Sequence, residues 1–212
     1  PRREQADIMR ALAKYGDGMV SLAEKGREIL MRRYGILGKK IHVIRHGVPP
    51  APEAKPAVLK EKYGLAGKEV LSTFGLLHPG KGIEYALRAL PAGVTKHPET
   101  VYLVLGQTHP EVQKRYGETY VEGLHRQVRQ LGISNNVVFV NRYLSQEELM
   151  DYLALTDIYI TPYLNPEQIS SGPLASAVAM GKAVVSTPYL CAKELLADGR
   201  GLLVPFKSSD AM

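Results

Sequence analysis

Short runs of apolar residues alternate along most of the chain with segments that carry apolar residues at helical spacing. The runs are continuous and rich in β-branched or aromatic residues, which is typical of strands buried on both faces of a parallel sheet. They occupy residues 69–74, 100–105, 136–140, 157–161, 183–187 and 201–205. Between them, IEYALRAL and EELMDYLAL have an amphipathic helical pattern, and Ser145 with Glu148 predicts a capping box. From Gly47 onward we therefore predict an α/β domain with a Rossmann-like, doubly wound parallel sheet and helices on both faces.

The first forty-odd residues fit this pattern less well. A strand, a helix and a second strand are expected at 18–23, 24–35 and 40–50, the last running into a proline-rich stretch. Such a βαβ fragment cannot bury both faces of its own sheet. We therefore expect it to be the tail of a preceding domain, in a chain that is part of a longer protein. The predicted divisions are a remnant and crossover strand at 1–46, a linker at 47–57 and a C-terminally incomplete domain at 58–212.

The charge and cysteine content narrow the function classes. The formal net charge is +6, but acidic residues are scattered throughout and no basic stripe interleaved with aromatic residues is present, which argues against a nucleic-acid partner. A mild basic excess suits anionic small molecules or peripheral contact with an acidic membrane surface. Cys191 is the only cysteine, so we expect an inert thiol and a cytoplasmic setting, at most peripheral to the inner membrane face. Residues 112–132 predict one charged surface helix.

The loop GLLHPGKG, residues 75–82, follows the first strand of the predicted domain and comes within one residue of the phosphate-binding signature G-x-x-x-x-G-K-[ST]. Gly82 replaces the hydroxyl that would hold magnesium, and no later strand ends in aspartate, so a P-loop nucleotidase is not favoured. A tight turn built by glycines and proline is the alternative. No G-x-G-x-x-G follows a predicted strand, which argues against a dinucleotide-dependent dehydrogenase. Lys81 nevertheless lies in the loop at the carboxyl end of the first strand, a position that favours binding of an anion.

A second anion-binding candidate lies in residues 165–188. Pro173 is expected at the first turn of a helix, where its missing N–H is harmless, with Ser171 or Gly172 as the cap. Ordinary capping is one interpretation. The other is that the N–H groups of Ser171, Gly172 and Leu174, together with the hydroxyls of Ser170 and Ser171, surround a phosphate. Two such loops at one sheet edge favour a diphosphate.

Four stretches resemble a known family, the retaining nucleotide-sugar glycosyltransferases of the GT-B fold, group 1 or family 4. KIHVIRHGVPP resembles the family's "ki.viphGv" crossover, and FGLLHPGKG resembles "vGrl...KG". NNVVFVNRYLSQEELMDYLALTDIYITPY is similar to "v.f.G.v..eel...y..aDi...PS". LASAVAMGKAVVSTPYLCAKELLADGRGLLVP is similar to "lEAmA.GkPVvat..gg..E.v.dg..G.lv". The stretch QISSGPLASAVAMGKAVVSTPY also resembles a mannosyltransferase-like branch of the family.

The resemblance implies a role for each candidate residue. Lys81 and Gln168 would be catalytic, and Tyr143, Leu144 and Ser176 would hold the nucleoside. The diphosphate of a nucleotide-sugar donor would lie on Gly75, Lys81, Ser170, Ser171, Gly172 and Leu174. No cofactor and no obligatory metal are expected. The carbohydrate or lipid-linked acceptor would bind mainly to an N-terminal domain outside this chain, so the chain alone should transfer nothing efficiently.

Several residues depart from the family pattern. Leu76 stands where the family has a second cationic diphosphate contact, and the paired family glutamates fall on Gln168 and Ser176. Glu167 lies one position from the first glutamate and is a candidate substitute. A catalytically lapsed sugar-nucleotide binding module or a GT-B epimerase are the alternative functions.

The sequence predicts few roles for the remaining aromatic and histidine residues. His78 is a candidate hydrogen-bond partner within the phosphate loop, and Tyr163 is a candidate for the sugar pocket. His42 and His46 are expected to be structural or solvent-facing. His97 and His109 are expected to have no role, because no metal-ligand spacing surrounds them.

Overall fold

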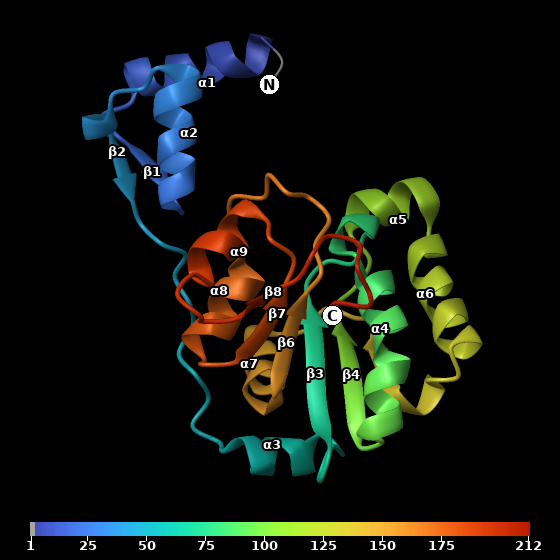
Figure 1. The fold of residues 1–212 in the computed structure, drawn as a ribbon. Coiled ribbons are helices and arrows are strands. Elements are labelled where there is room, and N and C mark those ends of the chain that lie inside the picture. The colour runs from blue at the N-terminus through green and yellow to red at the C-terminus, as the bar shows by residue number, and fades with distance from the viewer. Residues whose placement is uncertain (1–2) are drawn as a thin grey trace.

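The computed structural model describes residues 3–212, which contain a six-stranded parallel sheet and a separate two-stranded parallel sheet. Figure 1 shows the larger sheet at the centre of the molecule, with helices packed on both of its faces. Its strands are β3 (Glu69–Phe74), β4 (Thr100–Leu105), β5 (Val137–Val140), β6 (Ile158–Thr161), β7 (Ala183–Ser186) and β8 (Leu202–Leu203). The spatial order is β5-β4-β3-β6-β7-β8. This confirms the predicted doubly wound α/β sheet, because the chain builds outward from β3 in both directions.

Helices and short 3₁₀ turns link the strands of the larger sheet. The helices are α3 (Pro56–Lys62), α4 (Ile83–Lys96), α5 (Pro110–Tyr116), α6 (Thr119–Gln130), α7 (Gln146–Leu155), α8 (Gly172–Ala179) and α9 (Leu190–Leu195). The 3₁₀ turns are η2 (Pro79–Lys81) and η3 (Ser134–Asn136). The predicted capping box at α7 is confirmed, since the Ser145 side chain accepts from the Glu148 N–H while the Glu148 side chain accepts from the Ser145 N–H.

Two hydrophobic clusters hold the helices on the sheet. On one face, residues from β3, β4, β6 and β7 pack with α7, α8 and α9, and Leu103 is buried in this cluster. On the opposite face, Tyr102 packs with residues of α4 and α6. Neighbouring residues of β4 thus enter opposite clusters, which is what a strand covered on both faces requires. This explains why the strand sequences are continuously apolar.

Two sequence predictions need correction in this domain. The single surface helix expected at 112–132 is wrong, because the chain forms two helices there, α5 and α6. Gly117 separates them with a φ of 59° and a ψ of −141°, a backbone conformation that glycine adopts more readily than other residues. The strand expected at 201–205 is reduced to Leu202–Leu203, both exposed at the sheet edge.

Residues 3–46 form the smaller unit, which we call the N-terminal unit. It contains α1 (Arg3–Tyr15), β1 (Met19–Ser21), α2 (Glu24–Tyr34), η1 (Gly38–Lys40) and β2 (Ile41–Val43). The βαβ fragment was predicted, although β2 is much shorter than the 40–50 run, and α1 was not predicted at all. The unit has a small core of its own, with Ala13, Ile36 and Ile41 buried. Among residues 3–212, no helix is long and apolar enough to cross a membrane.

A carboxylate of α9 joins the N-terminal unit to the larger domain. Glu194 accepts hydrogen bonds from the backbone N–H groups of Glu24 and Lys25, at 3.1 and 3.2 Å, and lies 3.6 Å from the Arg45 guanidinium. Because the first N–H groups of a helix lack partners within it, the carboxylate completes the start of α2.

Candidate functional site

The two predicted anion-binding loops leave the sheet from neighbouring strands. β3 and β6 are hydrogen-bonded neighbours in the middle of the sheet, where the strand order reverses. In open α/β sheets such a reversal leaves a crevice beyond the carboxyl ends of the two strands, and ligands bind there. The loop at 75–82 follows β3 and the loop at 162–171 follows β6.

The two loops approach each other closely at Gly82. This glycine has a φ of 65° and immediately precedes α4. A Cβ atom built on it would lie 2.1 Å from the Pro162 carbonyl oxygen, so only glycine fits this position. A backbone hydrogen bond of 2.9 Å from the Leu164 N–H to the Gly80 carbonyl reinforces the approach. The loops therefore form one continuous surface.

Gly75, Lys81 and the start of α8 come together on this surface. Gly75 has a φ of 130°, and a Cβ built on it would lie 3.0 Å from the Lys81 Nζ and 3.9 Å from the Pro173 ring. The loop that follows β3 thus places the Lys81 ammonium group near the first turn of α8. The sequence predicted two anion-binding loops at one sheet edge, and the fold brings Gly75, Lys81 and the start of α8 close together there.

Lys81 is half-buried, and its Nζ donates a hydrogen bond of 2.8 Å to the Tyr163 hydroxyl. The Nζ also lies 4.1 Å from the centre of the Tyr163 ring, a cation–π distance. Burial disfavours the charged form and lowers the pKa of Lys81 to about 8. The sequence placed Tyr163 in a sugar pocket, but it contains no signal for contact with a lysine 82 residues away.

The start of α8 has the predicted cap. Ser171 is the N-cap, Pro173 lies in the first turn, and the Ser171 hydroxyl accepts from the Leu174 N–H at 3.3 Å. Ser171 is buried and Ser170 is exposed. The Leu174 N–H would therefore have to leave its cap to reach a phosphate, whereas Gly172 and Ser170 lie nearer the surface.

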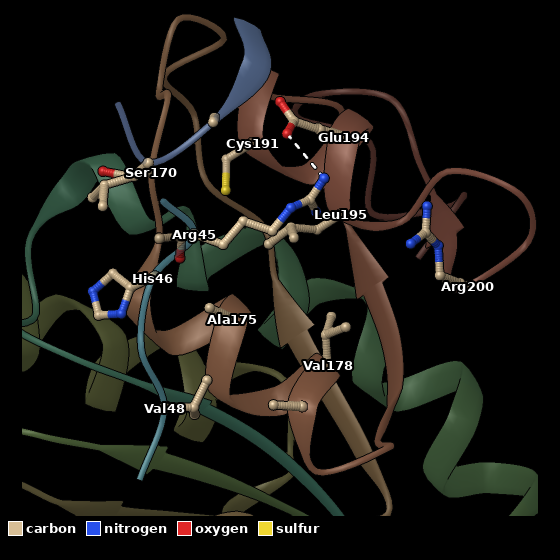
Figure 2. Close-up of a pocket in the computed structure, with 14 residues that line it drawn as sticks. Arg45, His46, Val48, Ser170, Ala175, Val178, Cys191, Glu194, Leu195 and Arg200 are labelled. Carbon is tan, nitrogen blue, oxygen red and sulfur yellow. Dashed lines mark ion pairs between the residues drawn. The ribbon is translucent and has the colours of Figure 1, made fainter. Parts of the chain in front are cut away.

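His46 was expected to be structural or solvent-facing, and the fold gives it a more specific position. It is exposed, yet its Nε2 lies 3.0 Å from the Cβ position of Gly172. Figure 2 shows it beside Ser170 at a cavity of about 250 Å³ between the N-terminal crossover and α8 and α9. Sequence reasoning missed this neighbour, because no local pattern relates the two segments.

The predicted sugar contact Gln168 is folded onto its own loop. Its side-chain amide donates to the Ser170 carbonyl at 3.1 Å. Glu167, the candidate substitute for the missing family carboxylate, is exposed and lies 3.7 Å from the Arg33 guanidinium of α2. Ser176 is buried on α8. Of these three side chains, Gln168 keeps its amide in the loop before α8, Glu167 faces α2, and Ser176 is buried.

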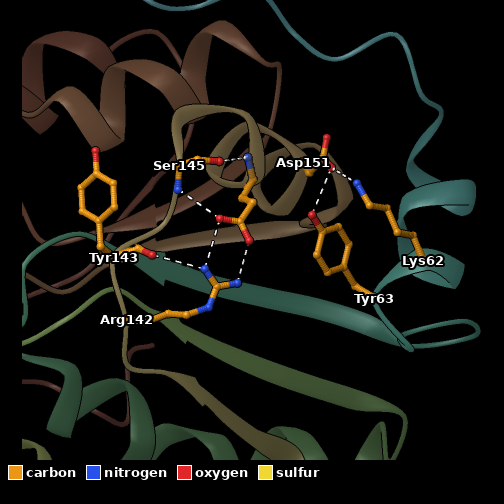
Figure 3. Close-up of polar contacts among 7 residues, drawn as sticks. Lys62, Tyr63, Arg142, Tyr143, Ser145 and Asp151 are labelled. Carbon is orange, nitrogen blue, oxygen red and sulfur yellow. Dashed lines mark hydrogen bonds and ion pairs between the residues drawn. The ribbon is translucent and has the colours of Figure 1, made fainter.

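Two of the predicted nucleoside contacts, Tyr143 and Leu144, lie after β5, which β4 and β3 separate from β6 in the sheet. Tyr143 is 76% exposed, whereas the Leu144 side chain is buried in the core and offers a ligand only its backbone. Arg142 forms two bonds with Glu148, at 3.1 and 2.6 Å, and donates to the Tyr143 carbonyl at 3.2 Å (Figure 3). The Arg142 hydrogen bond is the main reason that the pKa of Glu148 falls to about 2. The loop is therefore held by a charged pair.

Two histidines approach each other near the phosphate loop. His78 Nδ1 accepts from the Gly80 N–H at 3.1 Å, so its predicted hydrogen bond lies within the loop itself. Its ring meets that of His109 edge-on, with 5.9 Å between centres. Burial, and then the charges of Lys81 and His109, lower the pKa of His78. The sequence assigned His109 no role, and its ring contact with His78 was not predicted.

Potential metal ligands gather at the opposite end of the sheet. Glu69, His97 and Glu99 place ligand atoms within 4.8 Å of one another, at the amino ends of β3 and β4. The expectation that His97 lacks partners at metal-ligand spacing is therefore wrong: Glu99 lies two residues from His97, just before β4, and Glu69 comes from the start of β3. These three residues lie at the amino ends of the strands, whereas the two anion-binding loops follow the carboxyl ends of β3 and β6.

Comparison with known proteins gives a consistent result. Residues 68–212 match the family described as Glycosyl transferases group 1. Over 113 residues the chain is 33% identical to a GDP-mannose-dependent alpha-(1-6)-phosphatidylinositol monomannoside mannosyltransferase of Mycolicibacterium smegmatis. The matched stretch covers 53% of this chain and 26% of that protein.

Solved structures show the same fold. Anabaena HepE in complex with UDP matches 100% of the chain and 56% of its own length, with a TM-score of 0.82 and 20% identity. The C-terminal domain of LpcC, a group 1 family glycosyl transferase from Francisella tularensis, matches 75% of the chain and 78% of its own length, with a TM-score of 0.63 and 22% identity. The chain thus spans about half of HepE and a quarter of the mycobacterial relative. With the family match extending over most of the larger domain, this chain belongs to the group 1 glycosyl transferases.

Proposed function

We propose that this chain supplies the donor-binding half of a glycosyltransferase that uses a nucleoside-diphosphate sugar. The observation that carries the proposal is the convergence of Gly75, Lys81 and the first turn of α8 at the reversal point of the sheet. The printed names of relatives support the substrate class, since one is GDP-mannose-dependent and HepE was solved with UDP and with UDP-glucose. The family match favours a transferase over the epimerase and the lapsed binding module.

In the proposed mechanism, the donor diphosphate lies against Lys81 and the N-terminus of α8. As the bond between the sugar carbon and the diphosphate oxygen breaks, its electron pair moves to that oxygen, and negative charge grows on the leaving group. The Lys81 ammonium and the helix N–H groups stabilise this charge, and their effect is larger in a half-buried site than in water. An acceptor hydroxyl then bonds to the sugar carbon and passes its proton to the departing diphosphate oxygen, with retention of configuration in this proposal.

The remaining predicted residues complete the proposal. Gln168 would hydrogen-bond the transferred sugar after releasing the Ser170 carbonyl, but an amide cannot supply the charge of a carboxylate. Tyr143, the Leu144 backbone and Ser176 would contact the nucleoside. Cationic and N–H donors would neutralise the diphosphate without an obligatory metal. Loss of nucleotide binding on chelation would contradict this part of the proposal.

The acceptor would bind mainly outside this chain, and the isolated chain would be inactive in transfer. We also propose a cytoplasmic protein that contacts an acidic membrane surface peripherally. Residues 1–46 contain 11 Lys or Arg and 5 Asp or Glu, a net charge of +6, which equals the charge of the whole chain. This concentration of positive charge would favour anionic lipids. Sedimentation with phosphatidylserine vesicles at low and high salt tests the contact, and binding unaffected by salt would contradict it.

Calorimetric titration of the purified chain with UDP, GDP and ADP tests the donor site. We expect one nucleotide to bind, and Lys81→Ala to weaken it by about 1–3 kcal/mol, the usual range for a hydrogen bond to a charged group. Lys96→Ala is the matched control, because it removes the same charge from the last turn of α4. Equal affinity of Lys81→Ala and the wild type would refute the site.

A further inference from the structure

We propose that Tyr163 is a positioning residue that holds the Lys81 ammonium in place for the donor diphosphate. The inference rests on the proposed function and adds a residue to it. Its basis is the double contact between the two side chains. The Lys81 Nζ donates to the Tyr163 hydroxyl at 2.8 Å and lies 4.1 Å from the ring centre.

Tyr163 is itself fixed firmly enough to position another side chain. It is only 1% exposed, and its ring stacks on Tyr189 with 5.3 Å between centres and 18° between planes. The hydroxyl of Thr187 donates to the Tyr163 carbonyl at 2.5 Å, and the Tyr189 hydroxyl donates to Thr161 at 3.2 Å. A flexible lysine loses less order on binding a ligand when its end is already held by such a rigid group.

A tyrosine also holds an ammonium without cancelling its charge. A carboxylate partner would pair with Lys81 and compete with the diphosphate for it. Burial raises the pKa of Tyr163 to about 12, so the phenol stays neutral and offers a lone pair and a ring face. The partner therefore keeps the full positive charge available to the ligand.

Two features of the sequence make the placement of this lysine important. Leu76 stands where the family pattern has a second cation, so Lys81 carries the cationic contact of its loop alone. The family pattern that resembles residues 157–163 ends in Pro-Ser, whereas this chain has Pro162 followed by Tyr163. The two departures concern the same loop, since Tyr163 contacts Lys81, five residues after Leu76.

Substitution of single hydroxyl groups tests the inference. Tyr163→Phe keeps the buried ring and its stacking but removes the oxygen that contacts Lys81. Tyr102→Phe is the matched control, because it removes a fully buried hydroxyl that hydrogen-bonds Thr73 and not Lys81. We expect Tyr163→Phe to weaken nucleotide binding about three- to tenfold, in line with the loss of one hydrogen bond, and Tyr102→Phe to leave it unchanged. In a Lys81→Ala background, Tyr163→Phe should have no further effect.

Competitive acetylation of lysines, read by mass spectrometry across pH, provides a measurement that needs no nucleotide. Loss of the hydroxyl disfavours the charged lysine, so Tyr163→Phe should move the midpoint of Lys81 acetylation to lower pH, while Lys96 stays unchanged. An unchanged Lys81 midpoint, or an equal loss of binding in the Lys81→Ala background, would overturn the inference. If no nucleotide binds the wild type, the proposed function fails, and the acetylation midpoints still decide whether Tyr163 holds Lys81.

Discussion

Replacing Gly82 by alanine should separate the two loops of the site. The left-handed conformation, with a φ of 65°, disfavours alanine by about 1 kcal/mol or more. The new Cβ would also stand 2.1 Å from the Pro162 carbonyl oxygen, whereas real Cβ contacts stay beyond 3.0 Å. One backbone segment would therefore have to move by about 1 Å, a displacement that can reduce catalysis about a hundredfold. Because Lys81 is the adjacent residue, we expect Gly82→Ala to lose most of the binding free energy that Lys81 contributes.

Urea unfolding and nucleotide titration measure the two consequences separately. Gly93→Ala is the control, because Gly93 lies inside α4 and an added Cβ there meets nothing within 4 Å. We expect Gly93→Ala to stabilise the protein by about 0.5–1 kcal/mol through helix propensity and to leave binding intact. A Gly82→Ala protein with wild-type stability and wild-type affinity would refute the close approach of the loops.

Three further predictions follow from the contacts of the site and its neighbours. Nucleotide affinity should fall as the pH rises through about 8, because the pKa of Lys81 is depressed by burial and the ammonium is lost above it; calorimetry across pH checks this, and a flat profile would contradict it. Ser171→Ala should destabilise the fold by about 1 kcal/mol through loss of the α8 cap, measured in urea against Ser170→Ala, which should change stability less. Glu194→Gln should speed amide hydrogen exchange at Lys25, because a neutral amide accepts more weakly than a carboxylate; unchanged exchange there would show that the carboxylate does not hold α2.

The strands and the α8 cap could be predicted because their signals are local. A strand covered on both faces is continuously apolar, and β3 and β4 have the predicted bounds. The cap of α8, predicted at Ser171 or Gly172 and found at Ser171, depends only on the residues that follow it. In contrast, α1 was missed although Ile8 and Leu12 recur at helical spacing, and both side chains are more than half exposed in the structure.

Contacts between segments distant in sequence could not be predicted. The pairing of Lys81 with Tyr163 depends on β3 and β6 being neighbours, which only the assembled sheet determines. The position of His46 against Gly172 likewise depends on how the crossover lies over α8. The sequence identified the residue types that suit a diphosphate, but the side chains that fix their positions come from the tertiary structure.

The adjacency of β3 and β6 also determines when the site forms during folding. The hydrogen bond between Thr73 of β3 and the Ile160 carbonyl of β6 joins residues 87 positions apart. Closing so long a loop is slow relative to local pairing, and β3, β4 and β5 can assemble from consecutive segments first. On a ribosome, β6 and α8 emerge after that half of the sheet has left the tunnel. A nascent chain therefore brings Lys81 and the start of α8 together late, and a ligand bound by both loops would stabilise the finished sheet without guiding the earlier steps of its assembly.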